Sequence, residues 1–339
     1  MTFPLLAALV FLLLTLLPGA LVGGLLAWRG RATATFWRRL GWLHAALLPL
    51  HLFVTFPAAL GLLGSRGLST RPDERDYLGP VAGERHTIAS SDGVTLRAFR
   101  LPATQSPPVA TAVLVHGLFR CAKELEPVAT MLREQGCDCW LVELRNFGGS
   151  SRAPFTGGLH EADDVVAAVR YARERGGAGR PLLLFGVSFG TVAVSLALPR
   201  LDGVGGVVLD APIDDLVPAS QRLLDFNRPD RRSWLHLLPL WRSLVLSWLE
   251  FWSDFDATAV SPSEVLATLP VDLPVLLVGA GQDDRAPPDT VQRLFDRLPT
   301  LPDRKRLWLE PGSGHGRVFL DQPADYRARL AWLLGCLRR

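Results

Sequence analysis

The sequence predicts an α/β fold in which a mostly parallel β-sheet carries helices on both faces, preceded by a helical hairpin of membrane-spanning character. Short apolar runs alternate with helix-like segments along most of the 339 residues. Two longer uncharged runs come before residue 66. A serine flanked by glycines stands where one apolar run passes into a helix-like segment, and a tight strand-to-helix turn is expected there.

Residues 1–65 are predicted to form a transmembrane hairpin with spans of about 3–28 and 41–64. The first run contains no charged residue and exceeds the roughly 18–20 apolar residues that cross a bilayer. The second run is also uncharged, but Pro49 and Pro57 interrupt it, which membrane helices tolerate. A cleaved signal peptide is one alternative, although no Lys or Arg precedes the apolar core. A buried or interfacial second helix is another.

The loop between the two runs predicts how the hairpin is oriented. It carries Arg29, Arg31, Arg38 and Arg39. Positive residues in short loops favour the cytoplasmic side of a membrane. We therefore expect a multi-pass membrane protein with two spans, a lipid bilayer as partner, and the rest of the chain on the extracytoplasmic side.

The net charge of +3 arises in this N-terminal part. After Ser65 the chain has 32 basic and 33 acidic residues, because four of the 36 Lys and Arg and none of the 33 Asp and Glu come before it. Nucleic-acid binding needs a basic face, and no run of more than three basic residues follows Ser65. The composition thus argues against a nucleic-acid partner. It also places much of the high mean hydropathy of +0.21 in the two apolar runs.

Residues 66–83 are predicted to be a linker, and 84–339 a domain with one insertion. Asp92-Gly93 predicts a hairpin turn between two strand-like stretches. A helix is predicted over 161–175, where apolar residues recur on one face. Further strands are predicted at six apolar runs: 111–115, 139–144, 181–185, 205–209, 274–278 and 306–309.

Ser188 is the predicted nucleophile. It lies between Gly186 and Gly190, at the end of an apolar strand and the start of a helix. Side chains at either glycine would clash in so tight a turn, which presents the serine hydroxyl above the sheet. A hydroxyl is a poor nucleophile near neutral pH and needs a base. His315 is the candidate, because it lies in a glycine-rich loop directly after the last predicted strand.

The third catalytic group should orient the histidine and stand between serine and histidine in the sequence. Asp283 and Asp284 both follow the predicted strand 274–278. Asp283 is the preferred acid because of its place at the strand exit, and Asp284 is the alternative. Whichever acid is not used would be part of a solvated turn.

The oxyanion of an acyl-transfer reaction needs two N–H donors. His116-Gly117 ends the strand 111–115, and the amide that follows this pair, of Leu118, is one candidate. The amide of Phe189, directly after the nucleophile, is the other. His116 itself is expected to shape the loop rather than to act as a second base.

These residues resemble the α/β-hydrolase superfamily, with serine, acid and histidine in its usual order, over roughly 85–337. Within it, the chain is similar to the membrane-anchored, abhydrolase-domain and serine-aminopeptidase-like branch. That likeness depends on the stretch 143–150 (ELRNFGGS), on Ser261-Pro262-Ser263 and on Gly314-His315-Gly316. The resemblance implies an eight-stranded sheet, no cofactor, and hydrolysis of an ester, thioester or amide through an acyl-enzyme. No metal is expected either, because the sequence shows no spacing typical of metal ligands.

An insertion at about 213–262 is predicted to form a helical lid. More than 60 residues separate the strands 205–209 and 274–278, more than a direct crossover needs. Trp241 and Trp248 fall on one helical face within it. That face either packs on the domain core or forms an apolar, substrate-binding cap that touches lipid, since Trp favours that boundary.

The sequence therefore predicts a membrane-anchored serine hydrolase that cleaves a carboxylic ester, with a lipid-like acyl substrate as one candidate. A thioesterase, an acyltransferase or a peptidase would use the same three side chains. A non-catalytic scaffold on the same fold is an alternative of a different class.

Overall fold

A computed structural model describes residues 38–39, 42, 80–223 and 241–337. The chain divides into two compact units, one of residues 1–63 with 234–249 and one of residues 64–233 with 250–339. The second, larger unit contains the sheet and the residues of the candidate site described below.

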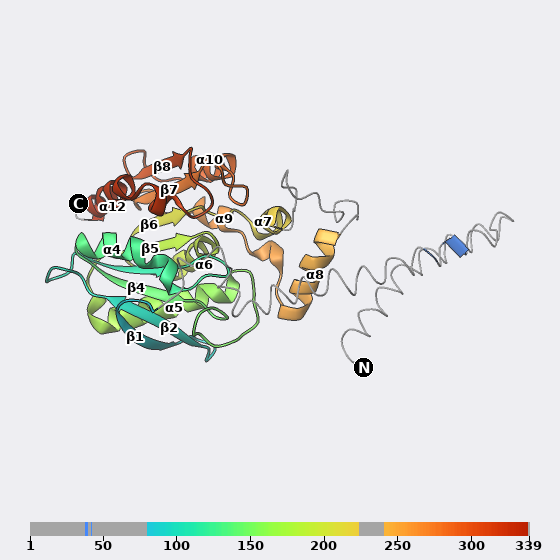
Figure 1. The fold of residues 1–339 in the computed structure, drawn as a ribbon, viewed down its shortest axis with the longest axis horizontal. Helices are drawn as coiled ribbons and strands as arrows, with labels where there is room; N and C mark the ends of the chain where they lie inside the picture. The colour runs from blue at the N-terminus through green and yellow to red at the C-terminus, as the bar shows by residue number, and fades with distance from the viewer. Residues whose placement is uncertain (1–37, 40–41, 43–79, 224–240, 338–339) are drawn as a thin grey trace. The chain divides into compact units, whose positions relative to one another are not determined.

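The larger unit is organised around an eight-stranded sheet (Figure 1). The strand order is β1-β2-β4-β3-β5-β6-β7-β8. Strand β2 runs antiparallel to β1 and β4, and the remaining neighbours are parallel. The strands are β1 (Glu84–Ala89), β2 (Thr95–Leu101), β3 (Ala110–Val115), β4 (Cys137–Glu143), β5 (Leu182–Val187), β6 (Val204–Asp210), β7 (Val275–Ala280) and β8 (Lys305–Glu310).

The central strands are apolar runs because both of their faces are covered. Every residue of β3, β4, β5 and β7 is buried. A strand buried on both faces has no need of polar alternation. Each of the six predicted apolar runs therefore corresponds to a strand with ends shifted by at most a few residues, and the turn at Asp92-Gly93 joins β1 to β2.

Helices cover both faces of the sheet. One layer contains α4, α11 and α12, which share a buried apolar core with β3, β4, β5 and β7. In the other layer α6 packs against α5 and α9. The helices of the described chain are α4 (Glu126–Glu134), α5 (Leu159–Ala172), α6 (Phe189–Ala197), α7 (Leu216–Leu223), α8 (Trp241–Ser253), α9 (Pro262–Leu266), α10 (Pro288–Arg297), α11 (Val318–Asp321) and α12 (Pro323–Leu337).

Helix α5 begins two residues before the predicted start at Glu161, because Glu161 is a capping residue. Its carboxylate accepts hydrogen bonds from the Gly158 N–H at 2.9 Å and from the Thr156 hydroxyl at 2.8 Å. A carboxylate in the first turn satisfies N–H groups that have no partner within the helix. The regular helix ends at Ala172, and the chain continues through a wider turn over Arg173–Gly177.

The parallel register brings the carboxyl ends of six strands, β3 to β8, to one edge of the sheet. Val115 at the end of β3 pairs with Gly186, and Val187 at the end of β5 pairs with Asp210. At the end of β7, Ala280 pairs with Glu310 of β8. Loops that follow these strands therefore emerge together, and ligands of open α/β sheets bind outside this edge.

The insertion after β6 returns to the domain close to where it leaves. The Leu216 N–H donates to the Val260 carbonyl at 3.0 Å. One oxygen of Asp215 accepts from the Ser261 hydroxyl at 2.8 Å and from the Ser263 N–H at 3.3 Å. These bonds join the two ends of the segment that carries α7 and α8 and define its base.

Trp241 and Trp248 lie on α8, but the positions of their side chains are outside what the structure describes, as are residues 224–240. The predicted spans 3–28 and 41–64 and the linker up to residue 79 also lie outside the described residues. Among the helices that are described, none has both the length and the apolar character needed to cross a bilayer.

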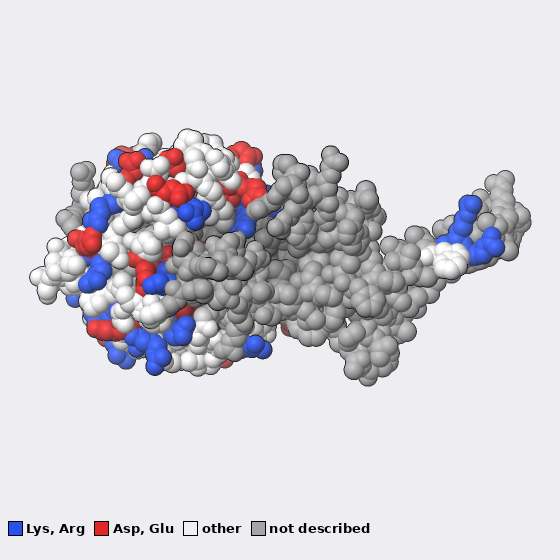
Figure 2. Space-filling model, in the orientation of Figure 1, with Lys and Arg blue, Asp and Glu red and all other residues white. Residues whose placement is uncertain are grey.

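Charges on the larger unit are mixed in sign. On the face that Figure 2 shows, Lys and Arg side chains alternate with Asp and Glu side chains. This agrees with the near balance of basic and acidic residues after Ser65.

Candidate active site

Ser188 occupies a strained turn between β5 and α6. Its backbone angles are φ 53° and ψ −121°, a region that costs a residue other than glycine about 1–3 kcal/mol. A Cβ on Gly186 would lie 2.6 Å from the Gly190 carbonyl oxygen, and a Cβ on Gly190 would clash with the Val115 carbonyl. Only glycine therefore allows the two arms of the turn to approach so closely, which is the steric reason that the sequence pattern predicted.

Backbone bonds hold the strained turn in place. The Ser188 N–H donates to the Asp210 carbonyl at 2.8 Å, across to the end of β6. The Ser188 carbonyl accepts from the N–H of Thr191 at 2.9 Å and from its hydroxyl at 2.6 Å. The same hydroxyl oxygen accepts from the Ile213 N–H at 3.0 Å, which links the turn to the start of the insertion.

The structure brings Ser188, His315 and Asp283 into one hydrogen-bonded chain. The Ser188 Oγ lies 2.6 Å from the His315 Nε2, and the His315 Nδ1 lies 2.7 Å from the Asp283 Oδ2. A carboxylate can only accept, so Nδ1 carries the ring proton and Nε2 accepts from the serine hydroxyl. The three side chains come from loops after β5, β7 and β8, the places from which the sequence predicted them.

The geometry separates the two aspartates that the sequence left open. The side chain of Asp283 is fully buried. Its Oδ1 accepts from the N–H groups of Arg285 at 2.9 Å and Ala286 at 3.0 Å. This leaves Oδ2 for His315. Asp284 is exposed, and the carboxylate that contacts His315 is that of Asp283.

His116 shapes the loop of residues 116–120 that follows β3, which we call the β3 loop. Its Nε2 accepts from the Leu144 N–H at 3.2 Å, so the proton must be on Nδ1, which donates to the Gly117 carbonyl at 2.7 Å. Burial lowers the pKa of His116 and keeps the ring neutral. The ring is therefore a fixed part of the loop, in agreement with the structural role expected from the sequence.

The two predicted oxyanion donors belong to segments beside the nucleophile, the start of α6 and the β3 loop. Phe189 is the first residue of α6, and the first N–H groups of a helix have no partner within the helix. Leu118 is half-buried in the β3 loop, and a Cβ on the preceding Gly117 would lie 3.3 Å from the Ser188 Cβ. The loop thus passes directly beside the nucleophile.

Two buried carboxylates that the sequence did not mark as functional hold the β3 loop and the turn that follows it. Glu124 accepts from the Gly117 N–H at 2.7 Å. Glu143 pairs with Arg97, whose Nε and Nη2 lie 2.5 and 3.1 Å from the two carboxylate oxygens. Glu143 also accepts from the Ala122 N–H at 3.3 Å.

Buried hydrogen bonds and ion pairs constrain which residues can stand in the stretch 143–150. The Gly149 N–H donates to Glu143 at 2.7 Å, and any side chain at Gly148, whose φ is 53°, would overlap the same carboxylate. Arg145 is buried and pairs with Asp164, and the Arg145 Nη2 lies 2.7 Å from the Asp164 Oδ1. The likeness to the family depended in part on this stretch, and these buried bonds are a physical reason for its residue types.

Asp210 is a further buried carboxyl at the site that sequence analysis missed. It ends β6, beside the nucleophile turn, and its Oδ2 accepts from the Tyr326 hydroxyl at 2.8 Å. Burial raises the pKa of Asp210 to about 7, and nearby Glu124 and Asp283 add to the rise, while the Tyr326 bond opposes it. The sequence signal that could have identified Asp210 is an acidic residue at the end of an apolar strand.

The four cysteines, Cys121, Cys137, Cys139 and Cys336, are free thiols. Burial raises the pKa of Cys139 well above its ordinary value, so this thiol is not a reactive nucleophile. Within the described ranges, no group of three or more His, Cys, Asp or Glu side chains could hold a metal ion.

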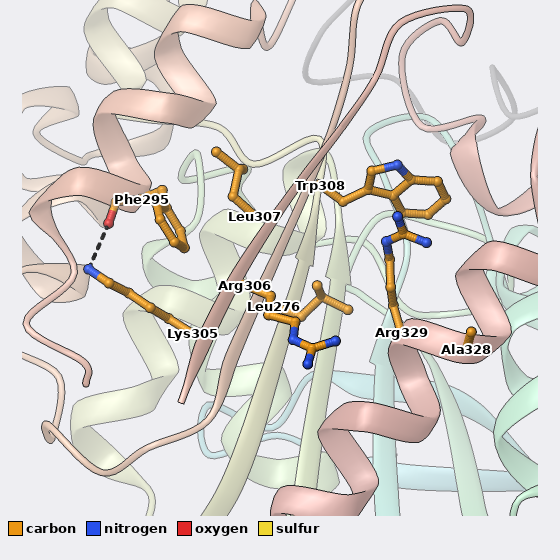
Figure 3. A pocket seen from close by; sticks show the side chains of 8 residues that line it. All are labelled: Leu276, Phe295, Lys305, Arg306, Leu307, Trp308, Ala328 and Arg329. Atoms are coloured by element: carbon orange, nitrogen blue, oxygen red, sulfur yellow. Dashed lines mark hydrogen bonds between the residues drawn. The ribbon is translucent and has the colours of Figure 1, made fainter. Parts of the chain in front are cut away.

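A hollow of about 550 Å³ lies between β8 and α12, and none of the three hydrogen-bonded catalytic candidates lines it (Figure 3). Its walls are occupied by charged side chains with partners of their own. Lys305 donates to the Phe295 carbonyl at 3.4 Å, and the Arg329 guanidinium lies 3.7 Å from the centre of the Trp308 ring. We therefore do not assign the reaction to this hollow.

Comparison with solved structures shows the same fold. An esterase from Pyrococcus furiosus superposes with a TM-score of 0.60 at 19% identity, covering 78% of this chain and 94% of the esterase. An esterase from Exiguobacterium antarcticum does so with a TM-score of 0.53 at 17% identity, covering 75% and 100%.

The sequence also has relatives. The uncharacterized protein YfhR of Escherichia coli is 27% identical over 274 residues, covering 76% of this chain and 83% of YfhR. A match to the sequence pattern of the alpha/beta hydrolase family extends over residues 112–329. This match spans more than half of the chain and includes the nucleophile turn, the acid and the histidine. The chain therefore belongs to the alpha/beta hydrolase family.

Proposed function

We propose that this protein is a serine hydrolase that cleaves a carboxylic ester through an acyl-enzyme. The observation that carries the proposal is the unbroken hydrogen-bonded chain from Ser188 through His315 to Asp283 at a strained nucleophile turn. Three groups in this order and geometry are the arrangement that activates a serine for acyl transfer.

In the proposed reaction, the Ser188 oxygen attacks the ester carbonyl carbon while His315 Nε2 takes the hydroxyl proton. The resulting imidazolium is stabilised by Asp283, and the N–H groups of Leu118 and Phe189 hold the negative oxygen of the tetrahedral intermediate. Collapse of that intermediate expels the alcohol, which takes the proton from His315. Water then attacks the acyl-enzyme with His315 again acting as base, which releases the acid and restores Ser188.

A fluorophosphonate probe tests the proposal, because such probes label only an activated serine. We expect the wild type to be labelled and to hydrolyse p-nitrophenyl esters, and Ser188→Ala to lose both. The loss in kcat should be at least about 1,000-fold, since single catalytic groups of such a triad contribute this much or more. Ser195→Ala, a buried serine on the same helix α6, is the matched control and should keep both activities. Full turnover by Ser188→Ala would refute the mechanism.

We further propose that the apolar runs at 3–28 and 41–64 anchor the protein in a membrane as a hairpin. The hydrolase domain would lie on the extracytoplasmic side, and the substrate would be lipid-like. Support comes from the uncharged runs and from the four arginines between them. An enzyme held at a bilayer meets acyl chains at high local concentration. The tryptophans on α8 are then suited to contact the acyl chain.

Replacing both Trp241 and Trp248 with Ser tests the lid. We expect kcat/KM to fall about 10-fold more for long-chain than for short-chain esters. Lost contact with two methylenes corresponds to roughly 1.6 kcal/mol. Leu301→Ser, which removes an exposed apolar side chain outside the insertion, should affect both substrates equally little. Equal losses on long and short esters in the double variant would count against a substrate-binding lid.

A further inference from the structure

We infer that Glu124 is a positioning residue: it holds the peptide before Gly117 and, together with the bonds to the Gly117 carbonyl, keeps the Leu118 N–H in place as an oxyanion donor. The inference rests on the proposed function and assigns a role to a buried carboxylate outside the catalytic triad. Glu124 lies in a short 3-10 turn, Ala122–Leu125, directly after the β3 loop, and only 4% of it is exposed.

The β3 loop has little intrinsic rigidity at the position that matters most. Gly117 has no side chain, so its two neighbouring peptide groups can rotate widely unless other groups hold them. Gly117 also passes close to the nucleophile, since a Cβ at this position would lie 3.3 Å from the Ser188 Cβ. No larger residue fits there without a shift. The loop therefore needs external hydrogen bonds to keep the next amide in one orientation.

Both peptide groups of Gly117 are held, from two different sides. The N–H of Gly117 donates to Glu124 Oε2 at 2.7 Å, which fixes the peptide before it. The carbonyl of Gly117 accepts from His116 Nδ1 at 2.7 Å and from the Arg120 N–H at 3.2 Å, which fixes the peptide after it. In a trans peptide the carbonyl and the following N–H point in opposite directions. The Leu118 N–H is consequently turned away from the buried His116 ring.

The charge of Glu124 is offset beside the loop. Its Oε1 lies 3.3 Å from the Arg120 Nε, and 5% of its side chain is exposed. An unpaired carboxylate near a developing oxyanion would oppose the reaction, whereas this ion pair partly offsets the charge and leaves Glu124 as a hydrogen-bond acceptor. The role is therefore geometric, and it depends on the length of the side chain and on an acceptor atom rather than on the negative charge.

Three substitutions separate length from charge. Glu124→Ala removes the acceptor, and we expect kcat for p-nitrophenyl acetate to fall about 10- to 100-fold with KM within about twofold, because a misplaced oxyanion donor costs this much. Glu124→Gln keeps the length and an acceptor oxygen and should retain most of the activity. Glu124→Asp keeps the charge but is one methylene shorter and should lose more than Glu124→Gln.

Binding of a trifluoromethyl ketone supplies a second readout, because the ketone forms a tetrahedral oxyanion with the nucleophile. Its inhibition constant should weaken across the three variants by the same factor as kcat/KM falls. Glu126→Ala is the matched control, since Glu126 is on the same segment, pairs with Lys123 at 2.5 Å and does not contact Gly117 in the described structure. It should leave kcat and the inhibition constant unchanged.

The outcomes distinguish this inference from the proposed function. If Ser188→Ala keeps full turnover, the proposed function fails, whatever the Glu124 variants do. If hydrolysis depends on Ser188 and Glu124→Ala matches the wild type, only the role of Glu124 is overturned. If Glu124→Ala does not fold, the other two variants decide, and higher kcat in Glu124→Asp than in Glu124→Gln would overturn the inference.

Discussion

Replacing Asp283 with Asn is expected to lower kcat for ester hydrolysis by about 10,000-fold, the magnitude found when a triad acid becomes an amide. The reason lies in the bonds on its other oxygen. Oδ1 accepts from the N–H groups of Arg285 and Ala286, so the amide oxygen of Asn would take that position. The amide NH2 would then face His315 Nδ1, which would force the ring proton onto Nε2. The Ser188 hydroxyl would face a donor in place of a base.

The same change at the neighbouring residue is the control. Asp284 is exposed, and Asp284→Asn should leave kcat within about threefold of the wild type, as is usual for surface substitutions. Steady-state kinetics of both variants, with circular dichroism to check folding, decide the assignment. A large loss in Asp284→Asn together with little change in Asp283→Asn would reverse it.

Asp210 is expected to make the protein less stable as the pH rises from about 4 to about 7. In the unfolded chain its carboxyl ionises near the ordinary pKa of 3.8, whereas burial raises the pKa in the folded protein to about 7. Between these values the folded state holds a proton that the unfolded state has lost. The free energy of unfolding therefore falls with rising pH and levels off above pH 8. The pKa difference corresponds to about 4 kcal/mol for this one group.

Asp210→Asn isolates this contribution, because an amide does not titrate and can still accept from Tyr326. Urea unfolding at pH 4 and pH 8 should show the variant gaining about 4 kcal/mol relative to the wild type between the two values. Asp289→Asn is a suitable control. Its carboxyl is exposed, and a hydrogen bond from Arg293 lowers its pKa, so it should show no such gain. A difference between Asp210→Asn and wild type that stays constant with pH would contradict the expectation.

The sheet and the order of the candidate catalytic side chains could be predicted because they depend on local pattern. Buried parallel strands are apolar runs whatever their neighbours are, and the nucleophile turn needs glycines at two fixed positions. The sequence favoured Asp283 over Asp284 from its place at the strand exit but could not exclude Asp284. The choice depends on which carboxylate the turn directs toward His315, and adjacent residues of one turn give no local signal for that.

The buried carboxylates Glu143 and Asp210 could not be predicted from the sequence, because their partners are distant along the chain. Glu143 meets Arg97 across 46 positions of sequence, and Asp210 meets Tyr326 across 116. A lone acid at a strand end is as consistent with a solvated loop as with a buried pair until the partner's position is known. Only the assembled sheet brings these groups together, since β2 lies beside β4 and α12 packs under β6.

The bond between Leu216 and Val260 has an evolutionary consequence. Because the chain departs from the sheet and rejoins it at one point, the intervening segment is a loop whose closure entropy grows slowly, by about 0.6 kcal/mol for each doubling of its length. Descendants of this protein can therefore lengthen, shorten or exchange that segment while the strands keep their register. Diversification of the molecules that such enzymes accept is then largely independent of the machinery that cleaves them.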